Sequence, residues 1–236
     1  PLVNLAAIFT AAMTISLVPA ISESRALEDF KSIRDKIRLG FRAAMIINFP
    51  CFVGLFFLAE KVAGLIYNAP GAAGAIQTMS AGILFLGLHQ ISTGILQGLK
   101  HTAIPVINMV IAGVVKVVLS WWLTAIPELG VKGAALATVA DFAVAALINM
   151  VFIYKFTGFC MTFGSVAKPL LASTIMGGVI FVVLHFTENL GAWAILFAMA
   201  AAVPTYAVSL LACGGLREED LERIMEILDS LKKKEE

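Results

Sequence analysis

Long apolar stretches alternate with short polar connectors along this chain. Seven stretches have the length and composition of a transmembrane helix, which needs about 20 mostly apolar residues. They cover residues 2–21, 42–60, 75–99, 103–126, 131–154, 166–186 and 190–213. No long polar block separates them, so the pattern predicts an all-α membrane protein, with one bundle of about seven transmembrane helices over residues 1–213.

Two further segments have a helical pattern but are too polar to cross a membrane. In residues 24–41, apolar side chains recur every three or four positions with charges between them, which predicts an amphipathic helix lying at the membrane surface. Residues 214–236 predict a second amphipathic helix, a cytoplasmic tail that either docks a partner or is simply a solvated end. The basic side chains expected to face anionic lipid along the first segment are Arg25, Lys31, Arg34, Lys36, Arg38 and Arg42.

Composition supports a membrane protein and gives no indication of a nucleic-acid partner. Hydrophobic residues make up 60% of the chain and charged residues 14%, whereas a soluble domain is about 45–50% apolar and about 25% charged. The net charge is +1, so no basic excess is available for a phosphate backbone. The three cysteines form no C-x-x-C motif and are expected to be unpaired.

The positions of Lys and Arg predict the orientation of the spans. Of the 17 basic residues, fourteen lie in the first, third and fifth connectors and in the tail, whereas only Lys61 and Lys132 lie near the alternate connectors. Cytoplasmic loops of membrane proteins are enriched in Lys and Arg. We therefore expect a multi-pass membrane protein with the N-terminus of this chain outside and its C-terminus in the cytoplasm.

One lysine, Lys116, lies in the middle of an apolar span. Asp141 lies in the next span, and each residue is thirteen positions from the end of its span that is expected to be cytoplasmic. The two charges should therefore lie at the same depth, where either one alone costs at least about 2.5–3.5 kcal/mol. We expect them to face each other or a hydrated cavity, either as part of a transport path or as a contact that sets the register of two helices.

Other polar residues lie in the same part of the membrane. Counting by fours from Lys116 reaches Asn108 and Ser120, and counting from Asp141 reaches Asn149. His89 and Gln97 lie in the third long span, where they would suit either a proton relay or an interhelical hydrogen bond. We expect these residues to form the substrate path or an intramembrane polar network.

Two prolines, Pro50 and Pro204, lie inside spans. Each removes one backbone hydrogen bond and predicts a kink, which a transporter could use as a hinge and which membrane helices also tolerate passively. Asn48, two positions before Pro50, is expected to cap the backbone group that the proline frees. The small-residue pair Gly94 and Gly98 predicts a close helix–helix contact.

The sequence carries no motif of a common enzyme class. It contains no H-E-x-x-H, no Walker loop and no G-x-S-x-G, and its three histidines fall at different depths. It also has no cluster of acids that would hold Mg²⁺ against a lipid diphosphate. We therefore expect no enzyme activity, no metal and no cofactor.

Three stretches resemble a known family when they are read in order. They are "SLVPAISESRA", "GILQGLKHTAIPVIN" and "VVKVVLSWWLTAIPELGVKGAALATVAD", and with the residues between and after them they cover about residues 14–150. They resemble the stage V sporulation protein B branch of the flippase superfamily, which also contains lipid II flippases, O-antigen flippases and multidrug (MATE) exporters. The resemblance implies about fourteen helices in two lobes. This chain would supply the second lobe and two extra helices, and an N-terminal half of the same protein would be its partner.

The resemblance also implies an activity. Such a protein would move an undecaprenyl-diphosphate-linked saccharide, a precursor of peptidoglycan or another polysaccharide, across the cytoplasmic membrane by alternating access. A cation-coupled multidrug exporter of the same superfamily is one alternative, in which Asp141 would titrate. A non-transporting membrane scaffold that docks partners through its tail is the other.

Overall fold

The computed structural model describes residues 2–187 and 191–215. Within them the chain forms seven α-helices and one short 3-10 helix, with no strand. All seven α-helices are long and apolar enough to cross a membrane, so the predicted all-α transmembrane bundle is confirmed. The expected tail helix over residues 214–236 lies almost entirely outside the described residues. The elements are α1 (Leu2–Ala26), α2 (Phe30–Leu65), η1 (Pro70–Ala72), α3 (Ala73–Gly98), α4 (Ala103–Thr124), α5 (Gly130–Thr157), α6 (Phe163–Phe186) and α7 (Ala192–Ala212).

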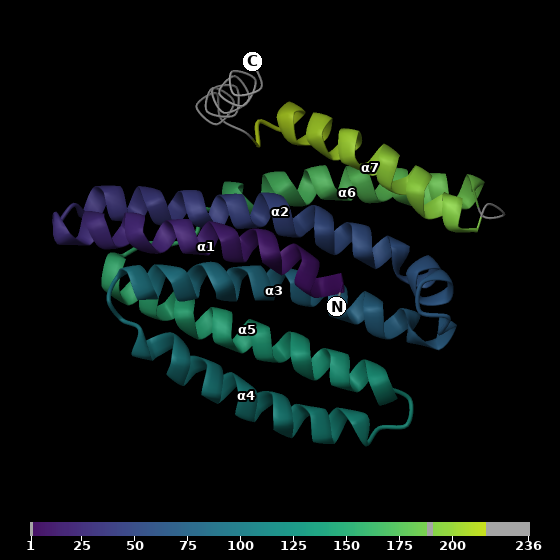
Figure 1. Ribbon diagram of the computed structural model, residues 1–236, viewed down its shortest axis with the longest axis horizontal. Coiled ribbons are helices and arrows are strands. Elements are labelled where there is room, and N and C mark those ends of the chain that lie inside the picture. Colours follow the sequence, from purple (N-terminus) through teal and green to yellow (C-terminus); the bar gives the residue numbers. More distant parts are fainter. Residues whose placement is uncertain (1, 188–190, 216–236) are drawn as a thin grey trace, which may run out of the picture.

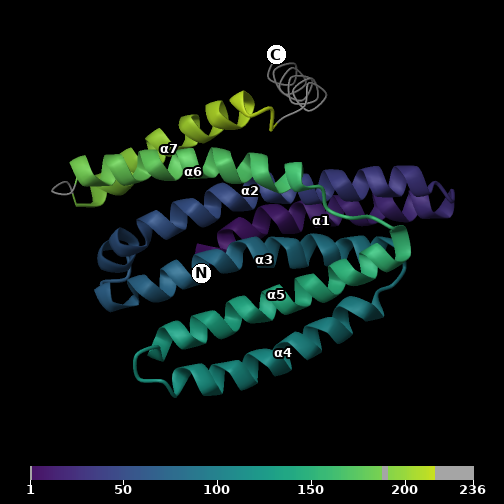
Figure 2. The same ribbon diagram turned by 180° about the vertical axis from the view of Figure 1, so that it is seen from behind.

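The helices lie side by side in a layered bundle (Figure 1), and the reverse view shows the same order (Figure 2). Helix α5 packs on both α3 and α4, α2 packs on α3 and α6, and α7 packs on α6. Helix α1 packs on α2 and α3. Helix α4 therefore forms one edge of the bundle and the α6–α7 pair forms the other.

The connectors alternate between the two ends of the bundle. Those that join α1 to α2, α3 to α4 and α5 to α6 lie toward one end, on the left of Figure 1, and α7 runs from the opposite end toward this one. We call this the basic end, because the basic residues of these connectors gather there.

Asp29 starts α2 by accepting a hydrogen bond from the backbone nitrogen of Ser32 at 3.0 Å. Lys100 (φ 62°) and Gly158 (φ 66°) follow α3 and α5 in the left-handed conformation.

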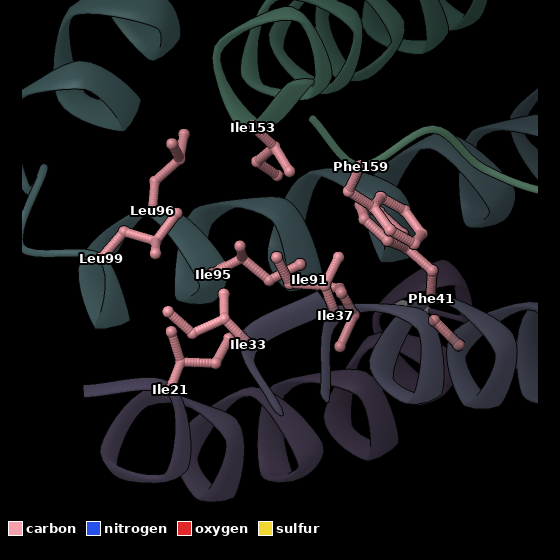
Figure 3. Close-up of a cluster of buried hydrophobic side chains, with 11 residues drawn as sticks. Ile21, Ile33, Ile37, Phe41, Ile91, Ile95, Leu96, Leu99, Ile153 and Phe159 are labelled. Atoms are coloured by element: carbon pink, nitrogen blue, oxygen red, sulfur yellow. The ribbon is translucent and has the colours of Figure 1, made fainter. Parts of the chain in front are cut away.

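A cluster of buried apolar side chains joins four helices at the basic end (Figure 3). Ile21 comes from α1, Ile37 and Phe41 from α2, Ile95 from α3 and Ile153 from α5. Beyond α5, the ring of Phe159 stacks on Phe41 with centroids 5.8 Å apart. The hairpin of α1 and α2 is thereby packed against α3 and α5.

Helices α1 and α3 approach closely because α3 carries glycine where they meet. A Cβ atom on Gly98 would lie only 2.8 Å from the Cβ of Ile21 and 3.0 Å from the backbone oxygen of Val18. A Cβ atom on Gly94 would overlap the side chain of Thr14. The small-residue pair of the sequence is thus a helix-packing feature.

The amphipathic segment 24–41 is not a helix of its own but is divided between two longer helices, and its position at the membrane surface stays a prediction. Residues 24–26 end α1, and α2 runs without a break from Phe30 to Leu65. The apolar stripe of Ile33, Ile37 and Phe41 is buried in the protein, since the segment turns back along α1 and contacts α3. A spacing of three and four identifies an apolar helix face, but it does not tell whether that face meets lipid or another helix.

Candidate functional site

The ammonium of Lys116 in α4 and the carboxylate of Asp141 in α5 form an ion pair. Lys116 Nζ lies 3.6 Å from Asp141 Oδ2. The Asp141 side chain is 17% exposed, whereas that of Lys116 is 42% exposed. The acid is therefore largely enclosed between the helices, while the lysine is also accessible from outside the bundle.

A second polar contact joins the same two helices nearer the basic end. Asn108 Nδ2 in α4 donates to Asn149 Oδ1 in α5 at 2.7 Å, and both residues are buried. Each asparagine is eight residues from the charged residue on its own helix, which is about 12 Å at about 1.5 Å per residue. Both contacts therefore follow from the same antiparallel alignment of α4 and α5. The buried Ala112 lies between them on α4.

The amide of Asn149 also reaches α3. Its Nδ2 lies 3.2 Å from Ser92 Oγ, 3.2 Å from Thr93 Oγ1 and 3.5 Å from His89 Nδ1. We call these residues, together with Asn108, the Asn149 network. It links the middle of α3 to the α4–α5 pair by side-chain hydrogen bonds between helices, which are one of the interactions that hold membrane helices together.

The structure separates two predicted site residues from this network. Gln97 is exposed on α3, and its side chain is not part of the Asn149 network. Ser120 is half-buried on α4 one turn beyond Lys116, and its backbone oxygen accepts a hydrogen bond from Thr124 at 2.6 Å. Sequence reasoning did not assign Ser92 and Thr93 to the site, although their position three and four residues after His89 was a usable signal.

Pro50 in α2 frees a backbone carbonyl that a different helix then satisfies. The carbonyl of Ile46, four residues earlier, has no amide hydrogen to accept from Pro50. The Tyr206 hydroxyl in α7 donates to that oxygen at 2.7 Å. Asn48 does not cap this break, because it is buried with neither amide atom hydrogen-bonded and lies against Gly87. Both α2 and α7 continue through their prolines, Pro50 and Pro204.

At the basic end, several cations are engaged by backbone carbonyls. Lys36 Nζ donates to the carbonyl of Ala20 at 2.8 Å and to Ser24 Oγ at 2.7 Å, which ties α2 to α1. Arg42 donates to the carbonyl of Gly215 at 2.6 Å, and Lys168 donates to the carbonyl of Gly214 at 2.7 Å. The last two contacts place positive charge at the C-terminal end of α7, where the helix dipole favours it.

The same residues line an open pocket of about 1230 Å³ between α1, α2, α6 and the end of α7. Its lining includes five cations and two acids together with apolar side chains of α1 and α3. Of the predicted basic interface, Arg25 and Arg34 do not line it. The charged lining residues of this pocket, which we call the basic pocket, are Lys31, Lys36, Arg38, Arg42, Lys168, Asp29 and Asp35.

Metal-binding side chains do not gather in this part of the molecule. Among residues 2–187 and 191–215, no three His, Cys, Asp or Glu side chains lie together so that they could hold a metal ion. Cys51, Cys160 and Cys213 are free thiols.

Comparison with known proteins places the chain in a family. The sequence profile of the family described as "Lipid II flippase MurJ" matches residues 4–202. Stage V sporulation protein B of Bacillus subtilis (strain 168) is 24% identical over 230 residues, which are 94% of this chain and 43% of that protein. The uncharacterized membrane protein YabM of the same organism is 31% identical over 150 residues, which are 64% of this chain and 28% of that protein.

A solved structure has the same fold. The structure of "Lipid II flippase MurJ, inward closed conformation" matches with a TM-score of 0.71 at 18% identity, over 88% of this chain and 45% of that one. The chain thus spans less than half the length of each of these three proteins. The resemblance that the sequence motifs indicated is confirmed, and the chain belongs to the lipid II flippase MurJ family of multi-pass membrane proteins.

Proposed function

We propose that this chain is the C-terminal part of a flippase that moves a lipid-linked saccharide, carried on undecaprenyl diphosphate, across the bacterial cytoplasmic membrane. Family membership supports a flippase of this general kind. The observation that carries the specific proposal is the half-exposed ammonium of Lys116 in the middle of a span. A cation at that depth is costly unless it has a partner, and a diphosphate is a partner that it could meet during transport.

In this proposal α4 and α5 form part of the wall along which the polar head group passes. Lys116 meets the negative charge of the head group, and Asp141 neutralises Lys116 when no substrate is there. Asn108 and Asn149 hold the two helices in register, so that the charged residues stay at one depth. An N-terminal half of the same protein supplies the facing wall, and the two lobes alternate between inward and outward access.

The basic end is the cytoplasmic end in this proposal. Nine of the described basic residues flank the connectors at this end, as the enrichment of Lys and Arg in cytoplasmic loops requires. Anionic lipid of the inner leaflet would meet the basic pocket, because the cations that line it outnumber the acids. The nine residues are Arg25, Lys31, Arg34, Lys36, Arg38, Arg42, Lys100, Lys155 and Lys168.

The test is a measurement of lipid-linked saccharide in the two leaflets of cells whose only flippase is the complete protein. Lys116→Met keeps the length of the side chain and removes its charge. We expect this variant to accumulate precursor in the inner leaflet, whereas Lys155→Met, which neutralises an exposed lysine at the end of α5, leaves the distribution unchanged. Equal leaflet distributions in wild type and Lys116→Met, with both proteins present in the membrane, would contradict the proposal.

The same cells separate the alternatives. A multidrug exporter predicts loss of drug resistance with Asp141→Asn and no change in precursor. A scaffold predicts that Lys116→Met and Asp141→Asn are both silent, while removal of residues 216–236 abolishes function.

A further inference from the structure

The C-terminal segment of the chain, residues 216–236, continues directly from residues that line the basic pocket. Gly214 and Gly215, which come immediately before this segment, are both part of the lining. Their carbonyls accept hydrogen bonds from Lys168 at 2.7 Å and from Arg42 at 2.6 Å. Two cations of the pocket therefore hold the end of α7 at the point from which the segment starts.

The net charge of the pocket is opposite to the net charge at the start of this segment. Five cations and two acids line the pocket, which leaves three net positive charges. Residues 216–222, with the sequence LREEDLE, contain four acids and one arginine, which leaves three net negative charges. The first seven residues of the segment would therefore balance the charge of the pocket.

The acids of the segment are close enough along the chain to reach these cations. Glu218, Glu219 and Asp220 come three to five residues after Gly215. An extended chain spans at most about 3.5 Å per residue, so these acids lie no more than about 10–18 Å from Gly215. A group tethered by a short linker also has an effective concentration on the order of mM at a nearby site. This tether favours the segment over a ligand that has to reach the pocket from elsewhere.

The pocket and the segment are also both amphipathic. The apolar side chains of Leu17, Leu39 and Ile91 line the pocket beside its cations, and Leu39 is 45% exposed. In the segment, apolar residues recur every three or four positions after the first acids, which predicts one apolar face of a helix. Such a helix would place its acids on the cations and cover the apolar lining as well. The apolar residues of this face are Leu221, Ile224, Met225, Leu228 and Leu231.

We propose that the basic pocket is the docking site of residues 216–225, with the acids at positions 218–220 on its cations. Docking joins the α6–α7 pair to the hairpin of α1 and α2, because the segment follows α7 whereas Lys31 and Arg38 lie on α2. The docked segment also occupies the cations that anionic lipid would otherwise meet. The segment and anionic lipid therefore compete for the pocket, and anionic lipid displaces the segment.

Docking is tested on the complete protein without substitutions, at one molecule per nanodisc of neutral phosphatidylcholine. A carbodiimide joins a carboxylate to a lysine that it contacts, and mass spectrometry identifies the linked residues. We expect cross-links between the acids at positions 218–220 and Lys31. Lys100 and Lys155 are the matched controls, because they are exposed lysines at the basic end that do not line the pocket. They should give several-fold fewer cross-links. No cross-link to Lys31, or equal yields at the three lysines, overturns the proposal.

Two further measurements test the role of charge and the competition with lipid. Arg38→Gln removes one cation of the pocket and releases Asp35 from its ion pair, whereas Arg34→Gln removes a cation of the same helix that does not line the pocket. We expect the cross-link yield at Lys31 to fall several-fold in Arg38→Gln and to stay unchanged in Arg34→Gln. Equal effects of the two substitutions would contradict docking through the charge of the pocket.

In nanodiscs that contain phosphatidylglycerol, the yield of the wild-type protein at Lys31 should also fall several-fold. A yield that anionic lipid does not change refutes the competition. None of these measurements depends on whether the protein transports a saccharide, so their failure and the failure of the proposed function are distinguishable.

Discussion

The hydroxyl of Tyr206 in α7 donates a hydrogen bond to the backbone carbonyl of Ile46 in α2, at 2.7 Å. That carbonyl has lost its donor within the helix because residue 50 is proline. Inside a membrane no water replaces a missing donor, so a neighbouring helix has to supply one. The α6–α7 pair is thus joined to α2 at the point where the backbone of α2 is incomplete.

The contribution of this bond can be isolated with a double-mutant cycle. Tyr206→Phe should lower the stability of the protein in detergent by about 0.6 kcal/mol, and by no more than about 1.7 kcal/mol, the range for interhelical hydrogen bonds in membranes. In a Pro50→Ala background the new backbone N–H can bond to Ile46, so Tyr206→Phe should cost almost nothing. Tyr154→Phe, at a 60% exposed tyrosine of α5, is the control. An equal cost of Tyr206→Phe in both backgrounds would show that the tyrosine acts in another way.

Loss of the Asn149 side chain should loosen α4. Asn149→Ala removes the acceptor of Asn108 and the donor to α3 together, and a buried polar group without a partner costs about 1–3 kcal/mol. Hydrogen exchange of α4 and α5 should therefore rise with little change in α7. Ser120→Ala, one turn beyond Lys116 and outside the network, should leave exchange unchanged; a similar rise in both variants would argue against a specific role of Asn149.

We expect the loss of one charge of the Lys116–Asp141 ion pair to lower the stability of the protein more than the loss of both charges. Lys116→Met leaves Asp141 largely enclosed and unpaired, and Asp141→Asn leaves Lys116 unpaired. On insertion scales an unpaired charge in the middle of a span costs at least about 2.5–3.5 kcal/mol. Thermal stability should fall in each single variant and recover in the double variant. Additive losses would mean that the two charges do not interact.

An alanine in place of a glycine should change the stability of the protein in opposite directions at Gly98, in the contact between α1 and α3, and at Gly113, on the open face of α4. Gly98→Ala places a methyl group 2.8 Å from the Cβ of Ile21, and overpacking of this kind costs about 1–3 kcal/mol. Gly113→Ala on α4 meets nothing within 4 Å, and it should gain up to about 1 kcal/mol of helix propensity. Melting temperatures should therefore move in opposite directions. A fall at both positions would point to a general intolerance of alanine.

The two polar contacts between α4 and α5 could be predicted from the sequence. Two adjacent helices joined by a short turn have few ways to pack against each other. Once the two helices are antiparallel neighbours, counting residues from the turn fixes which positions lie at the same depth. This reasoning matched Lys116 with Asp141, and the contact between Asn108 and Asn149 follows from the same register. The number and positions of the spans followed from apolar length alone.

The remaining contacts depend on which distant helices become neighbours, and a single sequence does not contain that information directly. The bond between Tyr206 and Ile46 joins residues 160 positions apart. The carbonyl partners of Arg42 and Lys168 lie at the end of α7 for the same reason. Gln97 was grouped with the buried polar residues because its span was apolar, although its own face of α3 is exposed.

The unbroken course of α2 has a mechanical consequence. From Pro50 to Phe30 the helix is about 30 Å long at about 1.5 Å per residue, so a bend of about 10° at the proline would displace the far end of this arm by about 5 Å. Lys36 and Arg42 fasten the arm to the ends of α1 and α7. A small bend of α2 at Pro50 would therefore become a larger displacement at the basic end. The start of α2 and the ends of α1 and α7 would move together.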